Sequence, residues 1–170
     1  MQEIYIENIG KIIPNKKKLE KELSVKITNK GKIVFVNGQG DKEYIALKVI
    51  EALNLGFSAE RALLLKDENF CLHILNIKDL TKRKNLKEIR ARIIGKRGGA
   101  LKTMCDLSDC LFSLDNNRVG IIGHVEDIEQ GIQSMTRLIQ GSRHANIYAK
   151  LEKIKHKKKL ERFLPVKKDN

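Results

Sequence analysis

The chain has 170 residues, and its 41% hydrophobic content is enough for a packed core, which excludes an intrinsically disordered chain. No run of about 18 apolar residues occurs, and residues 1–3 do not resemble a signal peptide, so neither a membrane protein nor a secreted protein is expected. We therefore expect a cytoplasmic protein of one ordinary or two small domains, with a net charge of +13.

Two stretches carry the excess of positive charge. Residues 82–102 contain nine Lys or Arg side chains and one acidic residue, whereas residues 150–168 contain nine basic and two acidic residues. Elsewhere 16 basic residues stand against 18 acidic residues, so the rest of the chain is nearly neutral. Charge gathered in this way indicates a polyanionic ligand rather than a general contribution to solubility.

The first part of the chain has the pattern strand, helix, helix, strand, strand, helix. In this order we expect the elements at residues 3–6, 9–13, 19–23, 25–28, 33–36 and 41–53. The two adjacent strands are joined at residues 29–31, a hairpin signal. A short helix capped by Ser58 follows, and its apolar residues indicate a fixed linker rather than a flexible one.

The same order then repeats. We expect its elements at residues 70–77, 86–94, 99–106, 110–114, 118–123 and 125–139. A last helix begins near His144 and runs into the basic residues 153–159. The repeat predicts two modules, at residues 1–66 and 67–155, followed by a basic C-terminal tail at residues 156–170.

The turn between the first two helices of the second module consists of Gly95, Lys96, Arg97 and Gly98. Its glycines allow a tight turn and the close approach of another backbone, and the next helix presents its free N–H groups there. With two cations, this turn suits a phosphodiester backbone and matches the Gly-x-x-Gly loop of a KH domain, which clamps about four nucleotides. A glycine C-cap beside a solvated Lys-Arg pair is the alternative interpretation.

Strand-helix-helix-strand-strand-helix is the type I KH order, and several segments resemble one family of tandem KH proteins. The matching segments are residues 55–63, 92–98, 121–123 and 141–151. They resemble archaeal and eukaryotic factors of small ribosomal subunit maturation of the partner-of-Nob-one type, with Krr-type factors as neighbours. The resemblance implies an α+β fold of two tandem type I KH domains, each a three-stranded antiparallel sheet packed on three helices, plus a basic C-terminal helix.

The resemblance also implies a function. Proteins of this kind bind single-stranded small-subunit ribosomal RNA near its 3′ end, and they contact the endonuclease that matures that end. A non-catalytic assembly factor without a cofactor is therefore expected, with other small-subunit proteins as further partners and no membrane partner.

The first module departs from this family pattern. Residues 14–17 stand 81 positions before the Gly-x-x-Gly turn but have the sequence Pro-Asn-Lys-Lys. Pro14 fixes its own φ and Lys17 carries a Cβ, so the close approach of an RNA backbone is compromised. We expect only secondary phosphate contacts there, through Lys16, Lys17 and Lys18.

Candidate RNA-binding residues of the second module lie on the turn and beside the adjacent groove. They are Arg90, Arg92, Ile94, Gly95, Lys96, Arg97, Gly98, Gly99, Lys102 and Phe112. Phe112 is the one aromatic candidate for base stacking, and with aromatic residues at 5% of the chain we expect hydrogen bonds to carry most selectivity. In the tail, Lys157, Lys158 and Lys159 are expected to add nonspecific phosphate contacts.

We find no constellation of residues for catalysis or metal binding. The four histidines lie in separate predicted elements without the spacing of metal ligands. Asp106 and Asp109 flank a helix end, where carboxylates are ordinary turn formers. Cys71, Cys105 and Cys110 are interpreted as small apolar core residues. A metal-dependent RNA nuclease or other RNA-processing enzyme is the alternative function.

Overall fold

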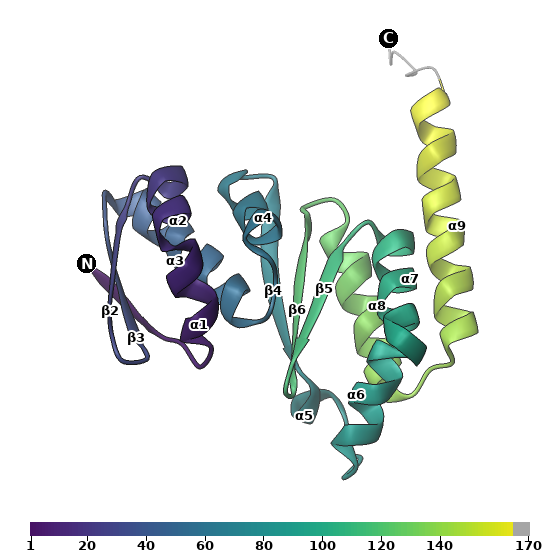
Figure 1. Cartoon of the computed structure of the whole chain (residues 1–170). Coiled ribbons are helices and arrows are strands. Elements are labelled where there is room, and N and C mark those ends of the chain that lie inside the picture. Colours follow the sequence, from purple (N-terminus) through teal and green to yellow (C-terminus); the bar gives the residue numbers. More distant parts are fainter. Residues whose placement is uncertain (165–170) are drawn as a thin grey trace.

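The computed structural model describes residues 1–164 and shows two α+β modules joined by a helical linker (Figure 1). The first module contains, in order, β1 (Gln2–Tyr5), α1 (Ile9–Ile12), the 3-10 helix η1 (Ile13–Asn15), α2 (Lys16–Leu23), β2 (Lys26–Lys30), β3 (Ile33–Asn37) and α3 (Gly40–Asn54). The linker consists of α4 (Ala59–Ala62) and the 3-10 helix η2 (Leu63–Lys66).

The second module repeats this order with two additional helices, α5 and α9. It contains β4 (Phe70–Asn76), α5 (Ile77–Leu80), α6 (Leu86–Ile94), the 3-10 turn η3 (Lys96–Gly98), α7 (Gly99–Ser108), β5 (Leu111–Asp115), β6 (Arg118–His124), α8 (Ile128–Gln140) and α9 (His144–Phe163). Helix α9, yellow in Figure 1, packs against α7 and α8 and then extends beyond them.

Each module has a three-stranded antiparallel sheet, with strand orders β1-β3-β2 and β4-β6-β5. The second strand of each hairpin therefore lies in the centre, between its hairpin partner and the first strand of the module. In the second sheet, β4 pairs with β6 from Phe70 opposite His124 to Asn76 opposite Arg118. The alternation of side chains along these strands directs one set of residues toward the helices.

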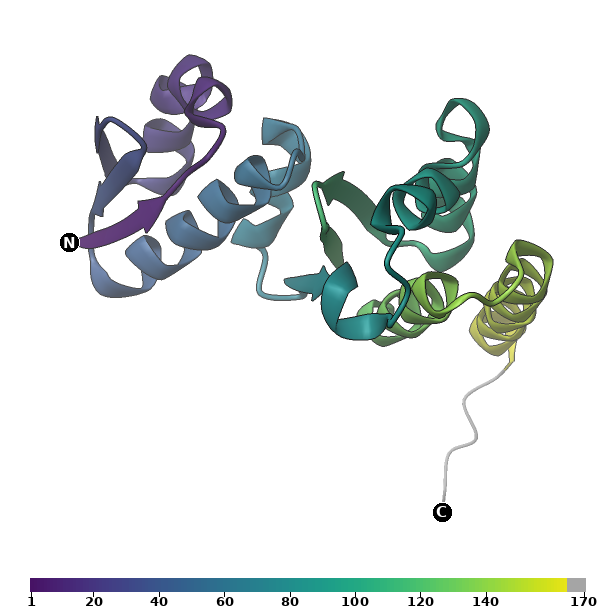
Figure 2. The ribbon, with the colours of Figure 1, turned by 90° about the horizontal axis from the view of Figure 1, so that it is seen from below.

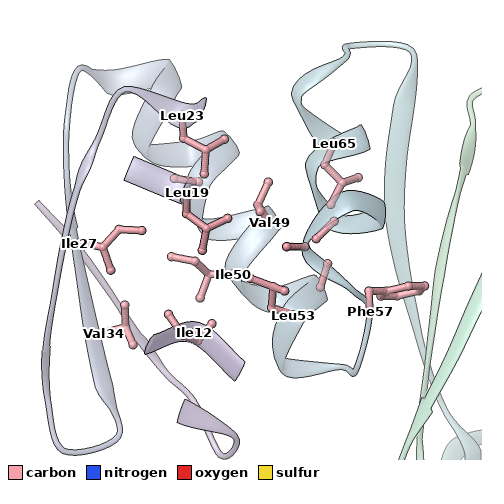
Figure 3. Close-up of a cluster of buried hydrophobic side chains, with 14 of the residues drawn as sticks. Ile12, Leu19, Leu23, Ile27, Val34, Val49, Ile50, Leu53, Phe57 and Leu65 are labelled. Carbon is pink, nitrogen blue, oxygen red and sulfur yellow. The ribbon is translucent and has the colours of Figure 1, made fainter. Parts of the chain in front are cut away.

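A core of branched aliphatic side chains fills the first module (Figure 3). Ile27 and Val34 project from the sheet toward Leu19 and Ile50 of the helices, and each of the four is at most 1% exposed. Ile33, the neighbour of Val34, points to the other face of the sheet and is 40% exposed. The first module therefore keeps a complete core despite its altered loop.

The sheet of the second module is covered on both faces (Figure 1). Val119 and Ile121 of the central strand β6 pack with α6, α7 and α8, whereas Ile122 belongs to the core of the first module. A Cβ on Gly120 would stand 2.8 Å from Cε2 of Phe57, so glycine is needed for this close packing. Figure 3 shows Phe57 pointing from the linker toward the second sheet.

The predicted element order and fold class are confirmed, with differences at several boundaries. Helix α2 begins at Lys16 rather than at residue 19, and the one-turn helix α5 was not predicted. Helix α9 continues through the predicted boundary at 155/156 to Phe163, and residues 165–170 of the predicted tail lie outside the described residues. Among residues 1–164, none of the helices has the length and apolar character needed to cross a membrane.

Candidate nucleic-acid interface

Three of the four residues in the Gly-x-x-Gly turn have a positive φ, which is uncommon in proteins. Helix α6 ends at Ile94, and Gly95, Arg97 and Gly98 follow with φ of 72°, 55° and 74°. Left-handed φ is free of strain for glycine, but it costs roughly 1–2 kcal/mol for a residue with a Cβ such as Arg97. The turn is thus held in a fixed shape between two helices.

Each glycine of the turn meets a different environment. A Cβ on Gly95 would stand 2.7 Å from the backbone N of Ala100, so this glycine allows α7 to begin directly against the end of α6. A Cβ on Gly98 would meet no atom within 4 Å. The open side of Gly98 is therefore where the backbone of a ligand can approach.

The corresponding residues of the first module do not form such a turn. Pro14 lies in η1, which continues into α2 at Lys16, and φ is −97° at Asn15 and −50° at Lys16. The first positive φ in this module occurs at Ser24, after α2 has ended. The first module thus has a nearly continuous helix where the second has a clamp-shaped turn.

The predicted cationic residues of the turn are accessible. Lys96, Arg97 and Lys102 are exposed, as is Gly99, and Ile94 is 41% exposed. Lys96 and Arg97 lie on the turn itself, and Lys102 follows one turn into α7. Two charges on the turn and one beside it can therefore face a phosphate.

An open groove of about 740 Å³ begins at Gly98 and runs between α7 and β5. Leu101 and Cys105 of α7 and Leu111 of β5 form part of its wall. Burial raises the pKa of the Cys105 thiol above its ordinary value, and the nearby positive charge of Arg61 offsets only part of this rise. Arg61, Lys102 and Lys155 also line the groove, as do Asp106 and Asp109, of which Asp109 is paired with Lys155. A groove with partly apolar walls and an excess of positive charge fits unpaired bases with their phosphates.

Phe112 lies at the groove, as expected, but it is largely buried. Its side chain is only 3% exposed because it belongs to the core of the second module, together with Ile121 and Met104. With so little of the side chain exposed, the ring offers little surface for stacking on a base in this conformation. The sequence placed Phe112 on the strand beside the groove, but it did not give the direction of the Phe112 side chain.

Arg90 and Arg92 are engaged with the protein itself. Arg90 donates from Nη1 to Oδ1 of Asn117 at 2.6 Å, which joins α6 to the β5–β6 turn. Arg92 donates to the carbonyl oxygens of Leu138, at 2.7 Å, and of Ser142. Arg92 therefore holds the C-terminal end of α8 against α6.

Several lysines of the predicted secondary contacts are paired with carboxylates. Lys18 lies 2.8 Å from Oε1 of Glu60, and Lys158 pairs with Asp127. Within residues 1–164, Lys16, Lys17, Lys157 and Lys159 form no ion pair. These four lysines remain the ones available for phosphate contacts.

Two further cations line the groove that sequence reasoning did not place there. Arg61 comes from α4 of the linker and Lys155 from α9, so three separate parts of the chain meet at this groove. Lys155 also donates to the backbone oxygen of Asp106 at 2.6 Å and lies 3.3 Å from Oδ1 of Asp109. Arg61 lies in residues 55–63, one of the segments that resemble the family. The periodicity of that segment does not indicate that Arg61 lines a groove in the second module.

Comparison with known proteins agrees with this architecture. The profile for the second KH domain of PNO1, described as a eukaryotic-type KH domain (KH-domain type I), matches residues 71–156. A KH domain-containing protein of Methanocaldococcus jannaschii is 30% identical over 162 residues, which cover 91% of this chain and 71% of that protein.

Solved structures from Pyrococcus horikoshii are similar over the whole fold. The crystal structure of Dim2p has a TM-score of 0.81 at 29% identity, covering 90% of this chain and 99% of that one. A chain from the complex of a/eIF2alpha, aDim2p and rRNA has a TM-score of 0.84 at 28% identity, covering 92% of this chain and 94% of that one. With the matched domain and the intact turn, the chain belongs to the PNO1-type family of KH-domain proteins.

Proposed function

We propose that this protein binds single-stranded RNA as a non-catalytic assembly factor of the small ribosomal subunit. The observation that carries the proposal is the turn at residues 95–98, with three left-handed residues, two exposed cations and an open approach at Gly98. The Pyrococcus horikoshii relative in complex with rRNA and a/eIF2alpha supports ribosomal RNA as the ligand.

The chemistry of binding follows from the geometry of the turn. A phosphate can approach the open side of Gly98 and meet the charges of Lys96 and Arg97 together with the free N–H groups at the start of α7. Charge-assisted hydrogen bonds to phosphate would fix the backbone, and the bases would enter the groove between α7 and β5. Because phosphates carry no sequence information, any base preference must arise in the groove.

We further infer binding near the 3′ end of the small-subunit rRNA and contact with the endonuclease that matures that end. These inferences extend the family membership and the rRNA complex of the relative. The relatives are archaeal, and archaeal cells have no nucleus, so the proposed site of action is the cytoplasm.

An assembly role is favoured over the alternative of a nuclease. Asp106 and Asp109, the carboxylates that first suggested one, lie at the end of α7, where Nζ of Lys155 donates to the carboxylate of Asp109 and to the backbone oxygen of Asp106. The ammonium group of Lys155 therefore neutralises the Asp109 carboxylate and satisfies a carbonyl group near the end of α7. Incubation of the purified protein with labelled RNA and Mg²⁺ should leave the RNA intact.

Reversal of the two loop charges tests the proposed clamp. In a Lys96→Asp, Arg97→Asp double variant, two carboxylates stand where a phosphate must lie, so affinity for single-stranded RNA should fall at least tenfold, about 1.4 kcal/mol. Fluorescence anisotropy at fixed salt measures this change. A Lys30→Asp, Lys32→Asp variant is the control, because it alters net charge equally on an exposed hairpin of the first module. An affinity of the folded loop variant equal to that of wild type would refute the assignment.

A further inference from the structure

The groove of the second module is completed by the linker between the modules. Arg61 of α4 lines it together with Gly98 and Lys102 of the second module. Arg61 is exposed, and within residues 1–164 its side chain forms no ion pair. An exposed, unpaired cation at the edge of a phosphate-binding groove extends the positively charged surface beyond the turn at residues 95–98.

The neighbouring residue ties the same helical turn to the first module. Glu60 accepts from Nζ of Lys18 on α2 at 2.8 Å. Helix α4 is thus a bridge, with one residue at the groove of the second module and the adjacent residue at α2 of the first. The pairing also neutralises the carboxylate of Glu60, so the surface of this bridge keeps the charge of Arg61.

A second cation of the first module lies at the junction. Nζ of Lys11 stands 3.4 Å from the position of a Cβ on Gly56, and Ser113 of β5 approaches the same glycine. Ser113 donates from Oγ to the carbonyl oxygen of Leu55 at 2.7 Å, so β5 is fixed directly beside the linker. Lys11 therefore stands close to the strand that forms one wall of the groove.

The two modules present these elements on one side of the molecule. Figure 2 shows α1 and α2 in purple, α4 in blue, β5 in green and the α6–α7 pair in teal along the same edge. Lys17 in the first turn of α2 is exposed, and its neighbour Lys18 is bound to α4. Arg61 and Lys11 thus mark a path that leads from the groove across the junction.

We propose that single-stranded RNA longer than the clamped segment continues from the groove over α4 and onto α1, held at its phosphates by Arg61 and Lys11. This proposal rests on the proposed function, because it requires RNA in the groove. The first module lacks a clamp of its own and instead provides a second length of phosphate-binding surface. RNA binding then depends on RNA length beyond the roughly four nucleotides that one KH groove holds.

The test compares two RNA lengths in the full-length protein. Fluorescein-labelled oligouridylates of about 6 and 18 nucleotides are titrated by anisotropy, with unlabelled competition for the weaker RNA. The Lys11→Gln, Arg61→Gln variant should bind the longer RNA about fivefold more weakly, with a salt slope smaller by about 1.4, and should bind the shorter RNA nearly as wild type does. A Lys30→Gln, Lys32→Gln variant removes the same charge away from the path and should change both affinities less than about twofold.

Each result separates the path from the clamp. If the Lys11→Gln, Arg61→Gln variant and the control variant bind the longer RNA equally well, the path is refuted, and the clamp stands as long as the loop reversal weakens binding at least tenfold. Equal losses on both RNA lengths would assign Arg61 to the clamp itself and refute the extension over α4. If the loop reversal also binds as wild type does, the proposed function fails as a whole.

Discussion

The two glycines of the clamp turn differ in what surrounds them, so one substitution at each separates folding from binding. Gly95 has the backbone of Ala100 against the position of its missing Cβ, whereas Gly98 has no atom within 4 Å of that position. Both have φ near 70°, so alanine is strained at either site. Only at Gly95 does a collision add to that strain.

We expect Gly98→Ala to keep the fold and weaken RNA binding. Its strain costs roughly 1–2 kcal/mol of stability, and its methyl group occupies the approach of the RNA backbone. Gly95→Ala should lose clearly more stability, because α7 must also move away from α6. Urea denaturation and RNA titration of both variants measure the two effects. Equal stability losses would show that the contact with Ala100 is unimportant.

Cys110 provides a pH-dependent test of core packing. Burial raises the pKa of its thiol to about 12, and its Sγ donates to the carbonyl oxygen of Asp127 at 3.4 Å. Above about pH 9 the unfolded chain releases this proton while the folded chain keeps it, so unfolding is favoured as pH rises toward 12. Below pH 9 both states hold the proton, and the thiol's contribution to stability does not change with pH.

The comparison of wild type with Cys110→Ala isolates this effect from the titration of other groups. The alanine variant loses the packing of the sulfur at every pH, so wild type should be more stable at pH 7. This advantage should shrink between pH 9 and pH 10.5, as measured by urea denaturation of both proteins. A stability difference that stays constant over this range would mean that the thiol ionises in the folded state.

At the scale of secondary-structure elements, Arg92 fixes the position of α6. Its guanidinium bonds the carbonyl oxygens of Leu138 and Ser142 at the end of α8, and the ring of His144 lies 2.9 Å from the backbone oxygen of Arg92. Free carbonyl groups at a helix end are common partners for a cation. Helix α6, which leads into the clamp turn, is therefore held to the end of α8 and the start of α9.

We expect Arg92→Ala to lower stability by about 2 kcal/mol or more, because hydrogen bonds to a charged group contribute about 1.5–3 kcal/mol each. Arg92→Lys should recover only part of the loss, since one ammonium group does not reproduce a two-pronged contact. Thermal unfolding of wild type, Arg92→Ala and Arg92→Lys measures the order of their stabilities. A variant of unchanged stability but reduced RNA affinity would return Arg92 to the RNA-binding residues.

The sequence predicted elements better than it predicted the direction of individual side chains. Periodicity identified α6 at residues 86–94 with the bounds that the structure has, and the turn at 95–98 was found from its glycines. Phe112 was named as the aromatic candidate beside the groove, but the sequence did not show that its side chain is only 3% exposed, because a strand on the edge of a sheet leaves either face open to burial. Helix α5 was not predicted, because a helix of a single turn is too short to show an apolar repeat.

The groove itself depends on contacts that no local pattern contains. Arg61 and Lys155 line it from elements about 94 residues apart in the chain. Their positions follow from the docking of the linker and of α9 on the second module, which is a property of tertiary packing. The sequence predicted that the linker is fixed and helical, but it could not show that Arg61 lies at the groove beside α7.

At the scale of the whole molecule, the second sheet depends on the first module for one of its faces. Ile122 of β6 lies in the core of the first module, and Leu55 and Phe57 of the linker cover β6 at Gly120. A sheet of three strands with one bare apolar face would be poorly stable alone. The two modules should therefore unfold together, and the groove should keep its shape only while they are docked.

We expect Phe57→Ala to uncouple the modules. Truncation of this ring, which is 3% exposed, should cost about 3 kcal/mol and split one urea transition into two, because the cover over β6 is lost. Phe35→Ala is the matched control, since Phe35 lies in β3 of the first module, outside both buried cores. It should lower stability less and leave a single transition. A single transition in Phe57→Ala, with the stability of the control, would mean that the modules are coupled by contacts other than this ring.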